Sequence, residues 1–150
     1  MNLQKLDFND TNELTAFIIN YKKENDIDIK TGMAESTNEL IGNVISSEYS
    51  SGFKSVSNNK ISGYIIMHII SFPMISGKEL YISDLFICSK QRGKGIGRQM
   101  LQKAEELAKQ NNCTRLMLNN NNESISYERL FYKKNGFKER TVFSNFVKKL

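Results

Sequence analysis

The sequence predicts a single α/β domain with a central mixed β-sheet flanked by helices, and three observations lead to this prediction. The chain has 150 residues, which suits one domain with a core of its own. Patterns typical of helices and of strands are interleaved along it. Near the middle, a strand pattern, a glycine-rich loop, a helix pattern and a second strand pattern follow one another, as in a parallel strand–helix–strand unit. We therefore expect one domain over residues 1–150 with a partly parallel sheet.

The first half of the chain contains two helix patterns and one hairpin pattern. Residues 7–25 have apolar side chains at helical spacing behind a polar capping region. These apolar residues are Leu14, Phe17, Ile18 and Tyr21. Residues 36–50 form a weaker helix pattern, with a Ser or Thr N-cap and Glu39 as its capping-box partner. Residues 52–72 predict a hairpin that turns at residues 58–59 and has a long, isoleucine-rich second strand.

The second half carries the strand–loop–helix–strand unit and two further elements. Residues 78–89 predict a strand whose second half is nearly all apolar, so we expect it to be central in the sheet. The helix after the glycine loop has one apolar face, made by Met100, Leu101, Ala104, Leu107 and Ala108. Residues 114–120 predict a buried strand and residues 126–137 a short helix. Residues 138–150 predict a final strand with mixed patterning.

Charge is unevenly distributed along the chain. Residues 1–89 hold 7 Lys or Arg and 11 Asp or Glu, a net charge of −4, whereas residues 90–150 hold 14 and 5, a net charge of +9. The basic part suits a polyanionic ligand and the acidic part a cationic one, although solvated helix faces would give the same split. Nucleic acid is a weaker prediction, because the basic residues are spread over several elements instead of one run.

Several classes of protein are not favoured by the sequence. There is no run of about 18 apolar residues that could span a membrane. The first ten residues lack an apolar signal core, so we expect a cytoplasmic protein. The two cysteines, Cys88 and Cys113, form no CxxC motif and fit reduced thiols in that compartment. The single histidine, His68, lies in the isoleucine-rich strand pattern and fits a structural role, and without a Cys/His cluster we expect no metal.

The glycine-rich loop between the strand and the helix predicts an anion-binding site. Its glycines are Gly93, Gly95 and Gly97, and their missing Cβ atoms allow positive φ and close approach of a ligand to main-chain N–H groups. The first N–H groups of a helix lack internal partners, and no Ser, Thr, Asp or Asn precedes this helix in the loop to cap them. The flanking basic residues are Arg92, Lys94 and Arg98. A phosphate or pyrophosphate fits best, but both the dinucleotide motif G-x-G-x-x-G and the P-loop motif are absent.

The segment Gln91-Arg92-Gly93-Lys94-Gly95-Ile96-Gly97 resembles the pyrophosphate loop, [QR]-x-x-G-x-[GA], of the GNAT N-acetyltransferases. The stretch "YISDLFICSKQRGKGIG" is similar to that family's fourth strand leading into the loop, and "LFYKKNGF" to its late helix with the aromatic-Tyr-x-x-x-Gly-Phe ending. The resemblance covers about residues 60–138, and the order of elements agrees along the whole chain. It implies a GNAT-like fold, in which the fourth and fifth strands splay apart.

The resemblance implies that acetyl-CoA is the acetyl donor. In the family the pyrophosphate lies on the N–H groups of the loop, which here comprises Arg92, Gly93, Lys94, Gly95, Ile96, Gly97 and Arg98. The pantetheine arm pairs in strand fashion with the end of the fourth strand, here the main chain of Leu85, Phe86 and Ile87. That pairing uses main-chain groups, so the side chains at these three positions carry no information about it.

The resemblance also implies roles for Tyr132 and Asp84. The tyrosine before x-x-x-Gly-Phe often protonates the departing thiolate in this family, and Tyr132 stands there, at the edge of the apolar face of its helix. Several members carry an acidic residue at the position of Ser83, which makes Asp84 the acidic candidate for the general base here. Strand alternation turns Asp84 to the opposite face from Ser83 unless a β-bulge intervenes, and the family's fourth strand usually contains one nearby.

These features predict direct acetyl transfer from acetyl-CoA to a primary amine of a small molecule or protein, with a cationic acceptor. The alternative is a non-catalytic CoA-binding or nucleic-acid-binding module on the same fold, because a fold does not determine a function. Tyr132 favours the enzyme, whereas the serine at position 83 favours the module. The sequence specifies neither the acceptor nor the oligomeric state, and it is compatible with a homodimer.

Overall fold

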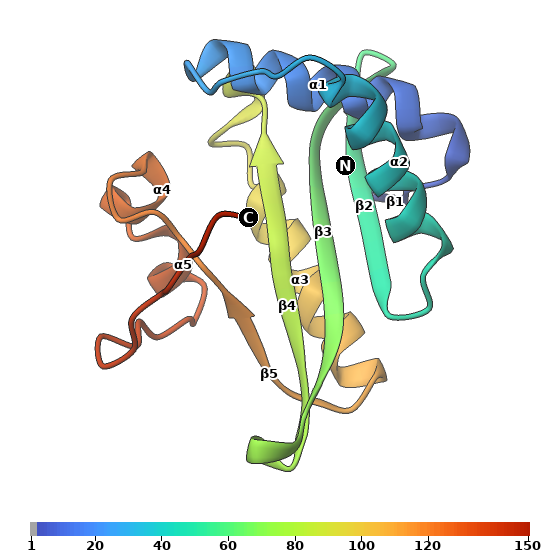
Figure 1. The fold of residues 1–150 in the computed structure, drawn as a ribbon. Coiled ribbons are helices and arrows are strands. Elements are labelled where there is room, and N and C mark those ends of the chain that lie inside the picture. Colours follow the sequence, from blue (N-terminus) through green and yellow to red (C-terminus); the bar gives the residue numbers. More distant parts are fainter. Residues whose placement is uncertain (1–2) are drawn as a thin grey trace. The chain divides into compact units, whose positions relative to one another are not determined.

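The computed structural model describes residues 3–150, which form two compact units (Figure 1). The first unit ends at Asn119 and the second begins at Asn120. The first unit contains a β-sheet with helices on both faces, and the second contains two short helices and the C-terminal segment. The predicted α/β class and the central mixed sheet flanked by helices are confirmed.

The sheet has five strands in the order β1-β2-β3-β4-β5. Their bounds are Gln4–Lys5 for β1, Ser50–Ser57 for β2, Lys60–Phe72 for β3, Gly77–Ile87 for β4 and Cys113–Leu118 for β5. The first four strands are antiparallel neighbours, and β5 is parallel to β4. The hairpin between β2 and β3 turns at Asn58 and Asn59, as predicted. Both have positive φ, +52° and +57°, which the right-handed twist of a two-residue hairpin requires.

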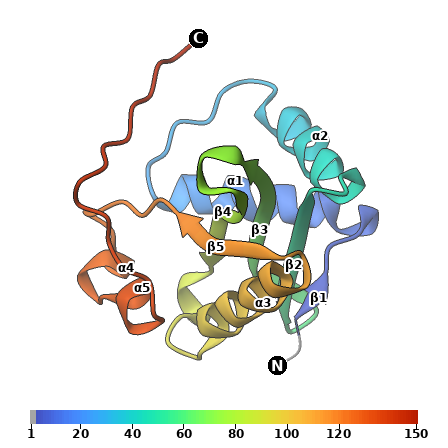
Figure 2. The same ribbon diagram turned by 90° about the horizontal axis from the view of Figure 1, so that it is seen from below.

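Three α-helices of the first unit cover the sheet (Figure 2). They are α1 (Thr11–Glu24), α2 (Met33–Ser46) and α3 (Ile96–Gln110). Helices α1 and α2 lie on one face and α3 on the other, as the view in Figure 2 shows. Three short 3-10 helices precede α1, join β3 to β4 and follow β4, at Phe8–Asp10, Pro73–Ile75 and Ser89–Gln91. Among residues 3–150, no helix is both long and apolar enough to cross a membrane.

Each face of the sheet has its own apolar core. On the α1/α2 face, the buried residues Leu14, Ile41, Tyr64 and Ile66 pack with the predicted α1 residues Phe17 and Ile18. On the opposite face, strand alternation places the fully buried side chains of β3 and β4 against the predicted apolar face of α3. The strand residues are Ile65, Met67 and Leu80, and the α3 residues are Met100, Leu101 and Ala104. The two cores fix the sheet from both sides.

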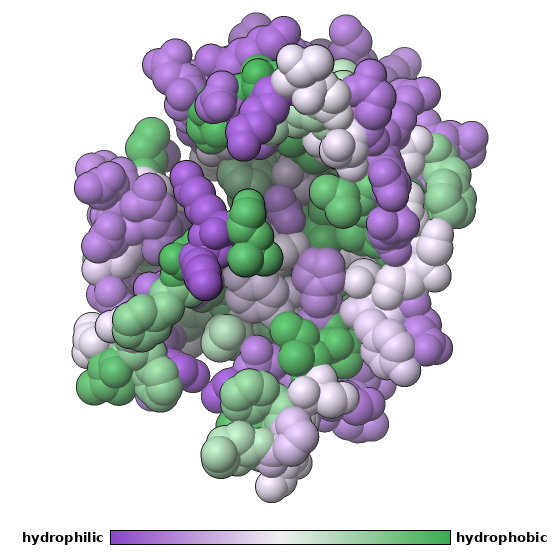
Figure 3. All heavy atoms as spheres, in the orientation of Figure 1, coloured by the Kyte–Doolittle hydropathy of each residue, from purple (hydrophilic) through white to green (hydrophobic). Residues whose placement is uncertain are grey.

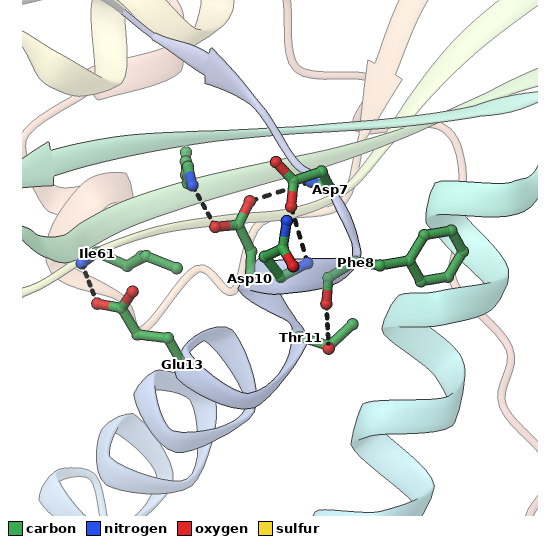
Figure 4. A network of polar contacts seen from close by, with 8 residues as sticks. Asp7, Phe8, Asp10, Thr11, Glu13 and Ile61 are labelled. Atoms are coloured by element: carbon green, nitrogen blue, oxygen red, sulfur yellow. Dashed lines mark hydrogen bonds and ion pairs between the residues drawn. The ribbon is translucent and has the colours of Figure 1, made fainter.

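A network of polar contacts anchors the start of α1 to the sheet (Figure 4). The Asp7 side chain accepts from the N–H of Asn9, and the Asp10 carboxylate accepts from the N–H of Asp7, at 2.8 and 3.0 Å. Asp10, which is buried, also forms an ion pair with Lys54 of β2. One turn later the Glu13 carboxylate accepts from the N–H of Ile61 in β3 at 2.6 Å. These contacts tie the helix to two strands of the sheet.

The predicted start of the second helix is wrong. Helix α2 begins at Met33, and its N-cap is Gly32, with φ +76° and no side-chain cap. Ser36 is already inside the helix, because its N–H donates to the Gly32 carbonyl at 3.1 Å. A residue whose N–H is bonded in this way cannot be the N-cap, so the capping box with Glu39 does not form.

Strand β4 leaves β5 before it leaves β3. The parallel pairing of β4 with β5 ends at Ile82, opposite Leu118. The antiparallel pairing of β4 with β3 continues to Ile87, opposite Gly63. Residues 83–87 therefore have β3 on one side and no strand of residues 3–119 on the other. The predicted splay of the fourth and fifth strands is confirmed (Figure 1).

The second unit contains two short helices where one was predicted. They are α4 (Ile125–Glu128) and α5 (Phe131–Lys134), separated by Leu130, which has φ +55° and a side chain 46% exposed. The end of α5 agrees with the prediction. Gly136 has φ +86°, its N–H donates to the Lys133 carbonyl, and the N–H of Phe137 donates to the Tyr132 carbonyl. This is a Schellman motif with glycine at C′.

The predicted final strand over residues 138–150 is wrong. No strand of the described sheet comes from this segment, whose local contacts are a turn and a stacking pair. The N–H of Phe143 donates to the Arg140 carbonyl at 3.3 Å, and the Arg140 guanidinium lies 3.7 Å from the centre of the Phe143 ring. The apolar residues that suggested a strand are exposed, among them Val142, Phe146 and Val147. Side-chain patterning cannot make a strand without a main-chain partner.

Apolar side chains also gather at the hairpin between β3 and β4, at the lower end of the molecule in Figure 3. Met74 is 88% exposed, and the Phe72 ring lies 5.3 Å from the Arg115 guanidinium of β5. In Figure 1 this hairpin lies at the opposite end of the sheet from the residues that follow β4. It is therefore distant from the candidate site.

The close pairing of β3 with the end of β4 gives a testable prediction. A Cβ added to Gly63 would lie 2.9 Å from the Phe86 carbonyl oxygen, a main-chain atom that cannot move away alone. Gly63→Ala should lower the free energy of unfolding by about 1–3 kcal/mol, measured by urea denaturation. Gly42→Ala in α2 is the matched control, because its Cβ would meet only the Phe8 ring at 3.8 Å. It should be neutral or slightly stabilising, and equal losses in both variants would contradict the argument.

Candidate functional site

The loop after β4 has the backbone that the glycine pattern predicted. Gly93 and Gly95 have φ of +79° and +82°, which side chains with a Cβ rarely adopt. A Cβ built on either residue would meet no atom of residues 3–150 within 4 Å, apart from those of its chain neighbours. The third glycine, Gly97, lies buried in the first turn of α3 beside Ile96. The first two glycines thus adopt the positive φ that the turn requires, and they leave the space beside the backbone open.

The N-terminus of α3 has no side-chain cap. Its N-cap is Gly95, and no side chain accepts from its first N–H groups. These N–H groups and the helix dipole favour an anion. Two of the basic residues are held close by: Arg92 Nε donates to the Ile87 carbonyl at 3.0 Å, and Lys94 Nζ donates to Gln91 Oε1 at 2.8 Å. Arg98 is exposed on the first turn of α3.

The free edge of β4 leads directly into this loop. The N–H of Cys88 donates to the Ser62 carbonyl at 2.9 Å, so the main chain of Cys88 faces β3. Main-chain groups point alternately to the two sides of a strand, so those of Phe86 also face β3. The main-chain groups of Leu85 and Ile87 then face the side that β5 has left. Of the three residues predicted to pair with a pantetheine arm, Leu85 and Ile87 have the geometry for it.

A β-bulge brings Asp84 to the face covered by α1 and α2. Asp84 pairs with Ile66 of β3, and Ile82 pairs with the next residue, Met67, so Ser83 is an extra residue in β4. Without the extra residue, strand alternation would turn Asp84 to the α3 face. The bulge that the resemblance implied is therefore present, and it lies at the position where β5 ends.

Two hydroxyl groups hold the Asp84 carboxylate. The Ser83 hydroxyl donates to Oδ2 at 2.7 Å, and the Tyr64 hydroxyl donates to Oδ1 at 3.3 Å. The Tyr64 ring packs against the rings of Phe86 and Phe17, at centroid distances of 5.7 and 5.6 Å. Burial, followed by the negative charge of Asp84, raises the pKa of Tyr64 well above its ordinary value. The phenol therefore stays protonated and remains a hydrogen-bond donor to the carboxylate.

Sequence reasoning missed this hydrogen-bond network. It assigned His68 a structural role and did not single out Tyr64. His68 Nε2 lies 3.0 Å from Ser83 Oγ, and His68 Nδ1 lies 2.9 Å from Ser50 Oγ on β2. The available signal was that Tyr64, Ile66 and His68 share one face of β3, the face to which the bulge turns Asp84.

Tyr132 belongs to the second unit and is described within it. Its ring contacts those of Phe131 and Phe137, at centroid distances of 5.0 and 5.7 Å. Burial raises the pKa of Tyr132, which favours the protonated phenol. The side chain thus has the protonation state that a proton donor needs, and the Schellman motif fixes the backbone that carries it.

The first unit combines three features that suit one kind of ligand. An open strand edge suits an extended amide-containing arm, and the uncapped helix N-terminus at its end suits a phosphate or pyrophosphate. The hydrogen-bonded Asp84 carboxylate lies on the same strand as the open edge. These residues fit acetyl-CoA with a proton acceptor nearby.

Comparison with known proteins agrees with this fit. The model of the acetyltransferase (GNAT) family matches residues 17–137. The chain is 34% identical over 79 residues to the Bacillus subtilis (strain 168) protein named Uncharacterized N-acetyltransferase YhfO, which covers 51% of each chain. It is 29% identical over 52 residues to thialysine N-epsilon-acetyltransferase of Bos taurus, which covers 35% of this chain and 31% of the relative. The chain thus spans about half or less of the length of these curated relatives.

A solved structure is similar over nearly the whole chain. It is that of a predicted acetyltransferase with acetyl-CoA from Clostridium acetobutylicum, with a TM-score of 0.80 and 21% identity. The similarity covers 97% of this chain and 95% of that one. At this identity the likeness establishes a shared fold.

The Tyr64–Asp84 contact predicts how stability depends on pH. A tyrosine in an unfolded chain loses its proton near pH 10, whereas folded Tyr64 keeps it, so stability falls as pH rises above about 10. One such group contributes up to ~1.4 kcal/mol per pH unit. Urea unfolding of Tyr64→Phe above that pH should show a shallower loss than the wild type. Tyr49→Phe, which alters an exposed tyrosine, should keep most of the wild-type slope. Equal slopes for Tyr64→Phe and the wild type would refute the assignment.

Proposed function

The chain belongs to the GNAT acetyltransferase family, and on that premise we propose that it transfers an acetyl group from acetyl-CoA to a primary amine by direct attack. The observation that carries this proposal is the open edge of β4 running into the uncapped, glycine-rich N-terminus of α3. The alternative, a non-catalytic CoA-binding module, would need the same edge and loop but no acid or base.

We further propose that the two compact units act as one catalytic domain over residues 1–150. The match to the family model extends from residue 17 to residue 137, so it includes both the sheet of the first unit and the helices of the second. The loop and Asp84 belong to the first unit and Tyr132 to the second.

Residues of the first unit hold the acetyl donor in this proposal. The N–H groups from Arg92 to Arg98 bind the pyrophosphate, with the three basic side chains of the loop adding positive charge. The Leu85 carbonyl and the Ile87 N–H pair with the pantetheine arm, while the Ile87 carbonyl accepts from Arg92 Nε and the main chain of Phe86 faces β3. When bound, acetyl-CoA supplies an activated thioester carbonyl. The acetyl-CoA in the Clostridium acetobutylicum structure supports this choice of donor.

Asp84 takes the proton from the acceptor amine. An ammonium group cannot attack, so it must first lose a proton to a nearby base. The Ser83 and Tyr64 hydroxyl groups each donate to one oxygen of Asp84, which leaves further lone pairs on both oxygens for the acceptor. The neutral nitrogen then bonds to the acetyl carbon to form a tetrahedral oxyanion and releases a second proton to solvent. When the oxyanion collapses, the carbon–sulfur bond breaks and its electron pair stays on sulfur. The N–H of Leu85, on the open edge, donates to the developing oxyanion.

Tyr132 donates a proton to the departing sulfur. Its half-buried phenol, whose pKa is raised by burial, is protonated at neutral pH, so it can act as the acid without prior uptake of a proton. The position of Tyr132 in the Tyr-x-x-x-Gly-Phe ending of α5 supports this role through the family resemblance.

The acceptor in this proposal is a cationic amine. Residues 1–89 carry a net charge of −4, and two helices of this segment, α1 and α2, cover the face of the sheet to which Asp84 is turned (Figure 2). The name of the Bos taurus relative, thialysine N-epsilon-acetyltransferase, refers to an amine of that kind on its own substrate. Its short match supports an amine acceptor and leaves the acceptor of this chain to experiment.

The cofactor site can be tested with a matched pair of glycines. Gly95 and Gly32 are both N-caps with positive φ, +82° and +76°, and a Cβ on either would meet nothing within 4 Å. Acetyl-CoA should raise the melting temperature of the wild type and of Gly32→Val by mass action. It should have no such effect on Gly95→Val, because the branched side chain blocks close approach to the loop. Pantetheine without the pyrophosphate should stabilise far less. Equal shifts in both variants would contradict the site.

The acid can be tested with a matched pair of tyrosines in the second unit. Release of the CoA thiol is followed with acetyl-CoA and a panel of amines. Tyr132→Phe should lower turnover on the active acceptor by roughly 10²–10⁴-fold and leave acetyl-CoA binding intact. Tyr127→Phe should leave turnover near that of the wild type, since the Tyr127 hydroxyl binds Glu139 at the surface. Unchanged turnover in Tyr132→Phe would refute its role, and acetyl-CoA binding without thiol release from any amine would favour the non-catalytic module.

A further inference from the structure

We infer that His68 is a positioning residue, which fixes the Asp84 carboxylate through the hydroxyl of Ser83. Four polar side chains on three strands form a continuous chain of contacts: Ser50, His68, Ser83 and Asp84. The contacts measure 2.9 Å, 3.0 Å and 2.7 Å in that order. This inference rests on the proposed function, in which Asp84 accepts the amine proton.

The order of donors along this chain follows from the single proton of Ser83. A serine hydroxyl can donate only one hydrogen bond, and the contact of Ser83 with the Asp84 carboxylate is the shortest it makes. The carboxylate has no proton to give, so Ser83 must be the donor there. Ser83 Oγ then has to accept from His68, which requires a proton on Nε2. The Nδ1 of the neutral imidazole is left as an acceptor for the Ser50 hydroxyl.

His68 thereby prevents the Ser83 hydroxyl from turning away from Asp84. Ser83 has two other acceptors within reach: the Ile66 carbonyl at 3.5 Å and, in the opposite tautomer, His68 Nε2 itself. With the proton on Nε2, the second of these is removed and the hydroxyl proton is committed to the carboxylate. Each bond in such a chain also polarises the next, which strengthens the contact to Asp84.

The position of Ser83 explains why it needs this support. Ser83 is the extra residue of the β-bulge and is exposed, so the regular pairing of β3 with β4 does not fix its side chain. His68 stands opposite Ser50 on β2 and opposite Tyr81 on β4, in the regular part of the ladder. The Tyr81 hydroxyl is engaged with Asn119 Nδ2 at 3.3 Å. His68 is therefore held by the regular strand pairing, and its hydrogen bond to Ser83 orients the side chain at the β-bulge of β4.

The tautomer can be measured without any acceptor, because the chain contains one histidine. Long-range ¹H–¹⁵N NMR of the full chain, above the pH at which imidazole is protonated, should show the proton on Nε2. Ser83→Ala removes the acceptor of that proton, so the preference should weaken towards the tautomer mixture of a histidine side chain in water. A proton on Nδ1 in the wild type, or no response to Ser83→Ala, would overturn the inference. Either result would leave the proposed acetyl transfer standing.

Kinetic measurements then distinguish a positioning role of His68 from a role in which its imidazole takes up a proton. Gln can place an amide N–H where His68 Nε2–H lies, but it cannot take up a proton. His68→Ala should lower kcat by about 10- to 100-fold with little change in the KM for acetyl-CoA, because the base is misplaced while the donor site is intact. His68→Gln should recover most of this loss, and Ser71→Ala, at an exposed serine of the same strand, should match the wild type.

These experiments distinguish failure of the positioning role of His68 from failure of the proposed acetyl transfer. A His68→Gln variant as slow as His68→Ala would show that the imidazole must take up a proton, and the positioning role would be wrong. Wild-type turnover in His68→Ala would overturn it as well. Absence of acetyl transfer by the wild type would refute the proposed function, while the NMR result would still decide whether His68 fixes Ser83.

Discussion

Strand β4 pairs with β3 over a longer stretch than with β5, and the rest of the site depends on this difference. The strand stays in the sheet with β3 as far as Ile87, but β5 stops opposite Ile82. Main-chain groups in a sheet interior need partners, and beyond the end of β5 no strand of residues 3–119 pairs with those of Leu85 or with the N–H of Ile87, whereas the Ile87 carbonyl accepts from Arg92 Nε. The cores on the two faces keep β4 in place despite this loss. The protein thus keeps an open strand edge that is rigid enough to recognise an extended ligand.

The same constraint determines where the charged and polar groups stand. A parallel neighbour would restrict a bulge in β4, and Ser83 is inserted immediately after the last residue paired with β5. The insertion turns Asp84 to the α1/α2 face, where Tyr64 can donate to it. At the far end of the open edge the chain turns through two residues of positive φ into α3. The Asp84 carboxylate, the open edge and the glycine loop therefore follow one another along a single strand and its end.

Local features were predictable from the sequence, and features that depend on distant partners were not. The glycine loop, the hairpin at Asn58 and Asn59 and the glycine at the end of α5 each require φ values that few residue types adopt. The start of α2 is a local exception, because Gly32 caps the helix through backbone geometry and not through a side chain that the sequence would reveal. The apolar pattern of residues 138–150 resembled a strand, but patterning does not supply a hydrogen-bonded neighbour.

The replacement of an acid by serine at position 83 has a physical consequence that sequence reasoning left open. Ser83 cannot serve as a base, yet its hydroxyl can accept from one side and donate to the other, which a carboxylate cannot do. A carboxylate at 83 would also stand beside that of Asp84, and two like charges so close would disfavour each other. A serine at position 83 is therefore compatible with an acidic group at position 84, provided that a β-bulge turns the side chain of residue 84 to the α1/α2 face. The chain meets that condition at Ile66, where the register of β3 and β4 shifts.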